Sequence, residues 1–336
     1  MRQCGDGNGS RELDREKSAR PVERIRGGSG VKREGRVICV GLAVMDQIYT
    51  VERLPETPTK HFATDFREIG GGPAANAAVA VARLGGEARL WSRVADDSIG
   101  DRIVRELDEE GVAVAGIRRI PGARSGSSAI VVDARGERMI VNFRGREMDP
   151  DPAWLPMSQV AEAGAVLGDL RWPEGSARAL SEARRLGVPA LLDADATPGR
   201  EGAEAFATAD HILFSGQGLI KLTGVDEIER ALRLAASRTD AWVGVSAGRA
   251  GVYWLEGERL RHLPGFDVEV VDTLGAGDVL HGAFALALAR GDGIEEALGF
   301  ACAAAALKCA RPGGRAGAPN TDEVEAFLEE RARQCS

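Results

Sequence analysis

Short apolar runs that alternate with helix-like segments are the feature of this sequence that most restricts its fold. Residues 37–44 form a continuous apolar run, and the helix-like residues 73–84 end at a glycine pair before the strand-like residues 88–93. Apolar runs of this kind are typical of parallel strands buried on both faces, and such strands need a crossover helix between them. The pattern predicts an α/β fold, a doubly wound three-layer α/β/α sandwich. Further strand candidates follow at residues 165–170, 190–193, 211–214 and 242–246.

Two segments break this alternation and favour a second, smaller β-sheet. Residues 47–68 lack a helical pattern, and residues 127–142 have the pattern of two alternating strands about a turn at residues 133–136. We expect both segments to leave the main sheet as β excursions. They either form a lid over a ligand site, which would exclude water from it, or are surface hairpins without that role.

The remaining chain is expected to form one domain with two short flanking segments. Residues 1–34 are rich in Arg, Glu, Gly and Ser and have few apolar neighbours, which cannot offset the entropy of ordering. We therefore expect a disordered N-terminal extension, a catalytic domain over residues 35–325 and a C-terminal tail over residues 326–336. A hydrophobic content of 44% supports a full core for the central part.

Charge, cysteine content and hydropathy argue against several classes of function. The net charge is −8, from 43 Lys and Arg against 51 Asp and Glu, and no basic tract follows residue 36, so we expect no nucleic-acid partner. The five cysteines lack metal-ligand spacing and indicate reduced thiols in the cytoplasm. No apolar run approaches the roughly 20 residues of a membrane span, so we expect a cytoplasmic protein with no membrane partner.

A glycine-rich turn within residues 270–284 carries the clearest chemical signal. It joins a strand to a helix through Gly275, Ala276 and Gly277 and ends in Asp278. Small residues let a ligand approach the backbone, and a helix N-terminus presents unpaired N–H groups to a phosphate. A carboxylate beside such a turn suits the base that takes a proton from an attacking hydroxyl. The sequence therefore indicates phosphoryl transfer; the alternative is an ordinary turn in which the helix dipole favours the acid.

This turn resembles the signature of a known enzyme family. Asp-Thr-x-Gly-Ala-Gly-Asp, intact from Asp272 to Asp278, is similar to the signature of the PfkB (ribokinase-like) carbohydrate kinases. Residues 68–78 resemble the family's N-terminal glycine motif, which enters a helix and contacts the sugar. The resemblance implies a ribokinase-like kinase with a small β lid over the sugar site. The lid often also forms the dimer contact, so a homodimer through it is our expectation.

The same resemblance implies a set of sugar-binding residues. Asp46, in the family pattern Gly-x-x-x-x-Asp that starts at Gly41, would accept hydrogen bonds from sugar hydroxyls. The backbone of Gly71 and Gly72 and the amide of Asn76 would hold the substrate. From the local sequence alone, the aspartate is equally explained as a turn cap and the glycines as a loop before a helix.

For the nucleotide, two further segments are similar to the family. Residues 243–251 end a strand in a glycine turn like the family's loop around the ATP phosphates. Residues 301–309 have the pattern of a small-residue helix that leads to residues 311–317, similar to the segment that shapes the adenine pocket and supplies backbone carbonyls to K⁺. The resemblance thus implies ATP, Mg²⁺ and a site for K⁺. The expected nucleotide-binding residues are Ser246, Gly248, Gly251, Gly275, Gly277 and Cys309.

One departure from the family concerns magnesium. The family carries Asn-x-x-Glu where residues 215–218 of this chain are Ser-Gly-Gln-Gly. Because Mg²⁺ must still neutralise the triphosphate, we expect it to be held mainly by ATP, with water or with Asp193 or Asp195 nearby. The missing glutamate also leaves open a sugar-binding regulator on an inactive kinase scaffold.

Three further residues bear on the choice of sugar. Lys60, Asn142 and Arg171 fall on the two lid segments and at the end of a strand, and could meet over one cleft. Two cations and an amide suit a tetrahedral anion, since buried cations need compensating charge; the alternative is solvated surface charges.

Extended similarity over residues 36–320 narrows the resemblance to the 6-deoxy-6-sulfofructose kinases of this family, in which the matching Lys, Asn and Arg hold the sulfonate. It implies phosphorylation of the C1 hydroxyl of 6-deoxy-6-sulfofructose, a sugar with an anionic group at C6. The alternatives are fructose, fructose 6-phosphate and 2-keto-3-deoxygluconate.

Overall fold

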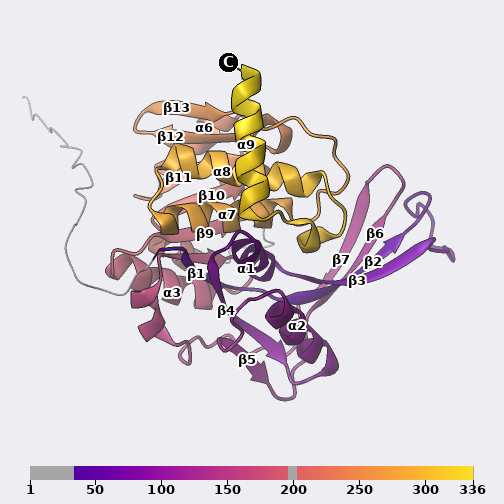
Figure 1. Cartoon of the computed structure of the whole chain (residues 1–336). Helices are drawn as coiled ribbons and strands as arrows, with labels where there is room; N and C mark the ends of the chain where they lie inside the picture. The colour runs from indigo at the N-terminus through magenta and orange to yellow at the C-terminus, as the bar shows by residue number, and fades with distance from the viewer. Residues whose placement is uncertain (1–33, 196–202, 336) are drawn as a thin grey trace, which may run out of the picture. The chain divides into compact units, whose positions relative to one another are not determined.

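A large β-sheet forms the centre of the protein (Figure 1). The computed structural model describes residues 34–195 and 203–335. The strands of this sheet are β1 (Arg36–Val40), β4 (Glu87–Ala95), β5 (Ile117–Ile120), β8 (Ala165–Asp169), β9 (Ala190–Ala194), β10 (His211–Ser215), β11 (Trp242–Ser246), β12 (Val252–Glu256) and β13 (Arg259–Leu263). Their order across the sheet is β13-β12-β11-β10-β9-β8-β1-β4-β5. The strands from β11 to β5 pair in parallel, whereas β12 and β13 add an antiparallel edge that the sequence analysis did not predict.

Helices cover both faces of this sheet, which confirms the predicted three-layer sandwich. Successive residues of β1 point to opposite faces: Val37 and Cys39 pack in one apolar core, and Ile38 and Val40 in the other. The first core includes α1 (Pro73–Arg83), α7 (Ala276–Arg290) and α8 (Ile294–Cys309), and α2 (Ser98–Glu109) and α9 (Thr321–Cys335) pack against it. The second includes α3 (Pro173–Arg185), α4 (Ala203–Thr208), α5 (Gly216–Thr223) and α6 (Ile228–Ala236). Short 3₁₀ helices are η1 (Met157–Glu162), η2 (Gly248–Ala250) and η3 (Gly314–Gly317).

A separate small sheet projects from the edge of this sandwich (Figure 1). Its strands are β2 (Val44–Thr50), β3 (Asp65–Gly71), β6 (Ser127–Val132) and β7 (Arg138–Phe143), in the order β3-β2-β6-β7. The two predicted β excursions therefore pair with each other, through the parallel contact of β2 with β6. The hairpin β6–β7 turns at the predicted position, where Gly136 N donates to Asp133 O at 3.0 Å.

The first predicted strand is wrong in its extent. The apolar run 37–44 is divided, because β1 ends at Val40, the chain bends at Gly41, and β2 starts at Val44 in the small sheet. Asp46, two residues after this run, lies inside β2. Residues of the run beyond the bend are buried where the two sheets meet, so the run is apolar without being one strand.

The expected C-terminal tail is also not a separate segment. Residues 326–335 continue α9, and the domain boundary expected at residue 325 falls inside this helix. Phe327 packs edge-on against Phe266 with ring centroids 5.2 Å apart, which ties the helix to the domain. The expected N-terminal extension, apart from Glu34, lies outside the described residues.

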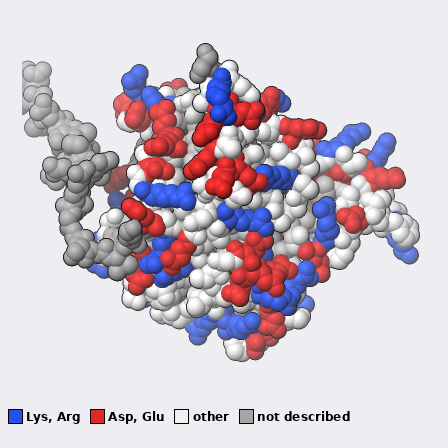
Figure 2. Space-filling model, in the orientation of Figure 1, with Lys and Arg blue, Asp and Glu red and all other residues white. Residues whose placement is uncertain are grey.

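The surface carries charges of both signs. On the face drawn in Figure 2, Asp and Glu are interspersed with Lys and Arg. Across the described part of the chain, no helix is long and apolar enough to cross a membrane.

Close packing of α1 against α7 depends on a glycine. A methyl group added at Gly282 would lie 2.5 Å from Ala77 O, a backbone atom that cannot move independently. We expect Gly282→Ala to lower the free energy of unfolding by about 1–3 kcal/mol through overpacking. Gly299 in α8 is a matched control because, outside its own helix, no atom in the described part of the chain lies within 4 Å of such a methyl group. Gly299→Ala should raise stability by about 0.5–1 kcal/mol. Urea unfolding of both variants measures this, and equal effects would contradict it.

Candidate active site

The N-terminus of α7 holds the carboxylate that the sequence indicates as a base. Gly275 caps this helix with φ at 77°, in the left-handed region that favours glycine, and Asp278 follows in the first turn. Asn76 Nδ2 donates a 2.7 Å hydrogen bond to Asp278 Oδ2. Removal from water raises the pKa of Asp278 to about 7, and the charge of Asp193 acts in the same direction, while the Asn76 hydrogen bond opposes both. The carboxyl group is therefore poised to exchange a proton near neutral pH.

A cavity of about 200 Å³ lies between the carboxyl edge of the large sheet and the small sheet. Such an edge is where open α/β sheets bind ligands. Most residues that the sequence assigns to sugar binding and catalysis line this space, which we call the sugar-side cavity. They are Asp46, Gly72, Asn76, Asn142, Arg171, Gly275 and Asp278.

The Asp46 carboxylate is buried at the wall of this cavity. Burial raises its pKa, whereas a hydrogen bond with Ser128 and the charge of Arg315 lower it. Gly71 lies behind Asp46, and any side chain there would collide with the carboxylate. Gly71 is not among the residues that line the cavity, in contrast to Gly72. Glycine is therefore needed at this position because it leaves room for the aspartate, and not because it contacts the substrate.

The three residues expected to bind an anion do not all meet. Asn142 lines the sugar-side cavity, where its Oδ1 accepts a 2.7 Å hydrogen bond from Ser128 Oγ. Arg171 also lines it, and its Nη2 lies 2.8 Å from Asp195 Oδ2. Lys60 is exposed in the connection between β2 and β3 and does not line the cavity. The structure thus brings together two of the three.

Arg144 is a cavity residue that the sequence analysis missed. It directly follows β7, two positions after Asn142. Alternation along a strand places residues two apart on the same side, so the position relative to Asn142 was a usable signal. The cavity is therefore lined by two arginines, Arg144 and Arg171, from different segments of the chain.

A second cavity, of about 370 Å³, lies on the other side of the glycine turn. Ser246, Gly248, Gly251, Gly277 and Cys309, all predicted to bind nucleotide, line this nucleotide-side cavity. Gly275 faces the sugar-side cavity instead. The segment Gly265–Val270, which also contributes to the lining, has no sequence pattern that marked it.

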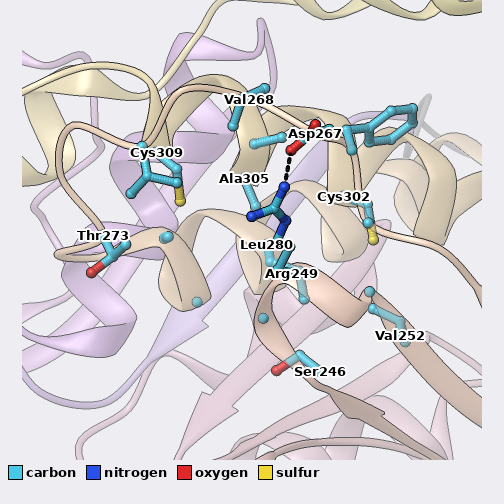
Figure 3. A pocket seen from close by; sticks show the side chains of 18 residues that line it. Ser246, Arg249, Val252, Asp267, Val268, Thr273, Leu280, Cys302, Ala305 and Cys309 are labelled. Carbon is cyan, nitrogen blue, oxygen red and sulfur yellow. Dashed lines mark hydrogen bonds and ion pairs between the residues drawn. The ribbon is translucent and has the colours of Figure 1, made fainter.

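An ion pair spans this second cavity. Figure 3 shows Arg249 reaching toward Asp267, with Thr273 and Cys309 to one side. The Arg249 Nη2 to Asp267 Oδ1 distance is 2.6 Å, and both side chains are exposed. Water screens such a pair, so it can separate at little cost when a ligand enters.

The two cavities meet at the turn from Gly275 to Asp278. Gly275 and Asp278 line the sugar-side cavity, and Ala276 and Gly277 line the nucleotide-side cavity. Apart from the backbone of its own helix and its chain neighbours, no atom of the described residues lies within 4 Å of where a side chain at Gly277 would begin, so a ligand can approach its backbone. This is the arrangement that in-line transfer between two ligands requires.

Buried ionisable groups lie close to Asp278. His281, in α7, directs Nδ1 at Gly277 O (2.8 Å) and Nε2 at Leu213 O (3.0 Å). Carbonyl oxygens only accept hydrogen bonds, so these two contacts favour the doubly protonated form of the ring. Burial alone would lower the pKa of His281, but the charge of Asp193 and these hydrogen bonds raise it. His281 lies in the helix of the glycine turn, but the sequence analysis gave it no role.

The carboxylates expected near magnesium lie beside this cluster. Asp193 is 5% exposed, and among the described groups its Oδ1 has no hydrogen-bond partner. Burial raises the pKa of Asp193 to about 6, against the charge of His281. Asp195 accepts a 2.8 Å hydrogen bond from Ser215 Oγ. In residues 34–195 and 203–335 no three metal-ligating side chains converge. The carboxylate oxygens of Asp193 and Asp195 are of the kind that Mg²⁺ takes as ligands beside phosphates and water.

The charge environment of Asp278 predicts a pH-dependent stability. The unfolded chain has an ordinary pKa of 3.8 at this residue and the folded protein about 7, so stability present at low pH is lost as the pH rises through this window. Asp278→Asn removes that loss. We expect the variant to have the higher Tm at pH 8, with the difference shrinking toward pH 5. Thermal unfolding at several pH values measures this, and a difference that grows toward acid would contradict it.

Comparison with known proteins agrees with this geometry. Residues 34–321 match the model of the pfkB family carbohydrate kinases. The chain is similar to the ribokinase of Bacillus subtilis, at 33% identity over 87% of this chain and 99% of that protein. It is also similar to an ATP-dependent ribose-1-phosphate kinase of Halopiger xanaduensis, at 34% identity over 88% and 99%. A crystal structure from Agrobacterium tumefaciens, of a protein proposed to be a ribokinase, has a TM-score of 0.85 and 39% identity, covering 89% and 99%.

These matches extend over nearly the whole described domain and include the glycine turn, the small sheet and both cavities. Kinases of this kind use ATP, typically with Mg²⁺. The chain therefore belongs to the PfkB family of carbohydrate kinases, ATP-dependent phosphotransferases that act on sugar hydroxyls.

Proposed function

We propose that this kinase phosphorylates the primary hydroxyl of a furanose that carries an anionic group at its opposite end, with the C1 hydroxyl of 6-deoxy-6-sulfofructose as the first candidate. The observation that supports this most is the sugar-side cavity, which combines Asp278 with Arg144 and Arg171. A base and a pair of guanidinium groups in one small cavity suit a substrate with a hydroxyl and an anion.

In the proposed mechanism, Asp278 accepts the proton of the attacking hydroxyl. Asp46 and Asn76 hold the sugar, and backbone N–H groups at Gly275 and Gly277 stabilise negative charge on the transferred group. Mg²⁺, when bound with ATP, neutralises the phosphate oxygens. The small sheet acts as the lid that keeps water from the reacting groups.

The anionic end of the sugar is assigned to Asn142, Arg171 and Arg144. Arg171 pairs with Asp195 in this structure, and an anionic substrate would share or replace that contact. Lys60 would contact the anion only if the connection between β2 and β3 folded over the cavity.

Ribose 1-phosphate is a second candidate, favoured by the relative whose name states that activity. In ribose 1-phosphate, too, the anion lies at the end of the furanose opposite a primary hydroxyl. Fructose 6-phosphate, fructose, 2-keto-3-deoxygluconate and ribose complete the panel of substrates to be compared.

The exposed face of the small sheet supports a homodimer. Phe66, Met139 and Val141 expose large apolar side chains on one face of β3 and β7. Apolar strands in this position would pair across a twofold axis with the same face of a second copy. Sedimentation analysis would test this, and a monomer at micromolar concentration would contradict it.

The role of Asp278 as base predicts a large loss of turnover. We expect Asp278→Asn to lower kcat by about 10²–10⁴-fold, the usual contribution of a general base. In the wild type, kcat/KM should rise as the pH increases through about 7, since the deprotonated carboxylate is the active form. A variant that keeps near-normal turnover would refute this assignment.

Arg171 should determine the preference for an anionic substrate. We expect kcat/KM to be highest for 6-deoxy-6-sulfofructose or ribose 1-phosphate, and Arg171→Ala to lower it by about 10–100-fold, as for loss of a charge-assisted hydrogen bond. The rate with neutral ribose or fructose should change little. Arg178→Ala, an exposed residue of α3, is the matched control. A wild-type preference for a neutral sugar, unchanged in Arg171→Ala, would refute the anionic substrate.

A further inference from the structure

A buried ammonium group lies beside the turn that carries Asp278. Lys308, in the last turn of α8, is 0% exposed. Its Nζ donates a 2.6 Å hydrogen bond to the backbone oxygen of Asp272 and lies 3.2 Å from Asp272 Oδ2. Burial lowers the pKa of Lys308, and the charge of Asp272 opposes that shift. A fully buried lysine is rare unless it is paired, so this contact requires an explanation.

Asp272 connects this ammonium group to two loops. Its Oδ1 accepts a 2.8 Å hydrogen bond from Leu274 N, within the glycine turn. Its Oδ2 accepts a 2.9 Å hydrogen bond from Gly314 N, in the loop after α8. Burial alone would raise the pKa of Asp272, but these hydrogen bonds and Lys308 lower it, so the carboxylate is ionised. Lys308 thus binds the carboxylate that fixes the backbone leading into Gly275.

The K⁺ expected from the family resemblance falls at the same place. It would be bound by backbone carbonyls of residues 311–317, next to the glycine turn. Here a carbonyl oxygen and a carboxylate beside that loop are already bound by an ammonium group, which is also a compact monovalent cation bound by oxygen atoms. A second cation close to Lys308 would be repelled by it. The residues present therefore do not fit a K⁺ requirement.

We propose that Lys308 is a positioning residue that supplies, from within the chain, the cation that fixes the phosphate-binding turn, so that this kinase has no requirement for K⁺. The proposal goes beyond the choice of substrate and holds for whichever sugar is phosphorylated. It differs from a purely structural ion pair, which would affect stability but neither turnover of the folded enzyme nor its response to cations.

The wild-type enzyme provides the first test. Its kcat, its KM for ATP and its Tm are measured in NaCl, KCl and tetramethylammonium chloride at equal ionic strength. We expect the three salts to give equal values within error. A saturable activation by K⁺, or an increase in Tm specific to K⁺, would overturn the proposal.

Variants of Lys308 provide the second test. Lys308→Met keeps the length of the side chain without its charge, and Lys308→Ala opens space for a free cation. We expect kcat of the folded methionine variant to fall about 100-fold, as when one preorganised electrostatic contact is lost. In the alanine variant, K⁺ or ammonium should restore part of the activity and raise Tm. Lys221→Met, at an exposed position of α5, is the matched control and should behave as wild type.

The remaining outcomes also test the proposal for Lys308. A folded Lys308→Met enzyme with wild-type kcat would overturn the proposal. If both variants fail to fold, the salt comparison on the wild type decides alone. If no sugar of the panel is phosphorylated, the proposed substrate fails, while the effect of K⁺ on ATP affinity and Tm still tests Lys308.

Discussion

Backbone amides from separate segments converge on one buried carboxylate, that of Asp169 at the end of β8. It accepts hydrogen bonds from Leu42 N (2.8 Å) and Ala74 N (3.2 Å), and from Arg171 N (2.8 Å). These amides belong to the bend before β2, the start of α1 and the loop before α3. Burial raises the pKa of Asp169, but the amide hydrogen bonds oppose this. These three segments lead into or carry Asp46, Asn76 and Arg171, which are assigned to the substrate. The walls of the sugar-side cavity therefore depend on this anchor.

Asp272 plays the corresponding part on the nucleotide side, and the two anchors have different charge balances. Asp169 is held chiefly by backbone amides, whereas Asp272 adds the ammonium of Lys308. The buried Asp193 and the half-buried Asp278 both lie beside one imidazole, that of His281. Removal from water raises the pKa of both acids, and the charges of neighbouring carboxylates act in the same direction. A cation that arrives with ATP would oppose these shifts, which is consistent with a site prepared for a metal-bound nucleotide.

The sequence predicted the sandwich because each layer leaves a local pattern. The helix at residues 73–84 and the strands 190–193 and 242–246 agree with the structure to within one residue. It failed at residues 37–44, where an apolar run is shared by two sheets and no local pattern marks the bend. Most of the candidate site was also predicted, since glycine turns and strand ends are local signals. Lys60 was misplaced, and Arg144 and the segment 265–270 were missed, because their place depends on how distant segments pack.

By itself, the sequence determined the fold class, the main residues of the two cavities and the position of the candidate base, because apolar periodicity and glycine-rich turns act within a few residues of the chain. Only the tertiary structure decided which charges meet. Asp169 lies far along the chain from Leu42 and Ala74, and Lys308 from Asp272, so nothing local links them. Electrostatic interactions depend on distance and on exclusion from water, and both are set only once the chain has folded.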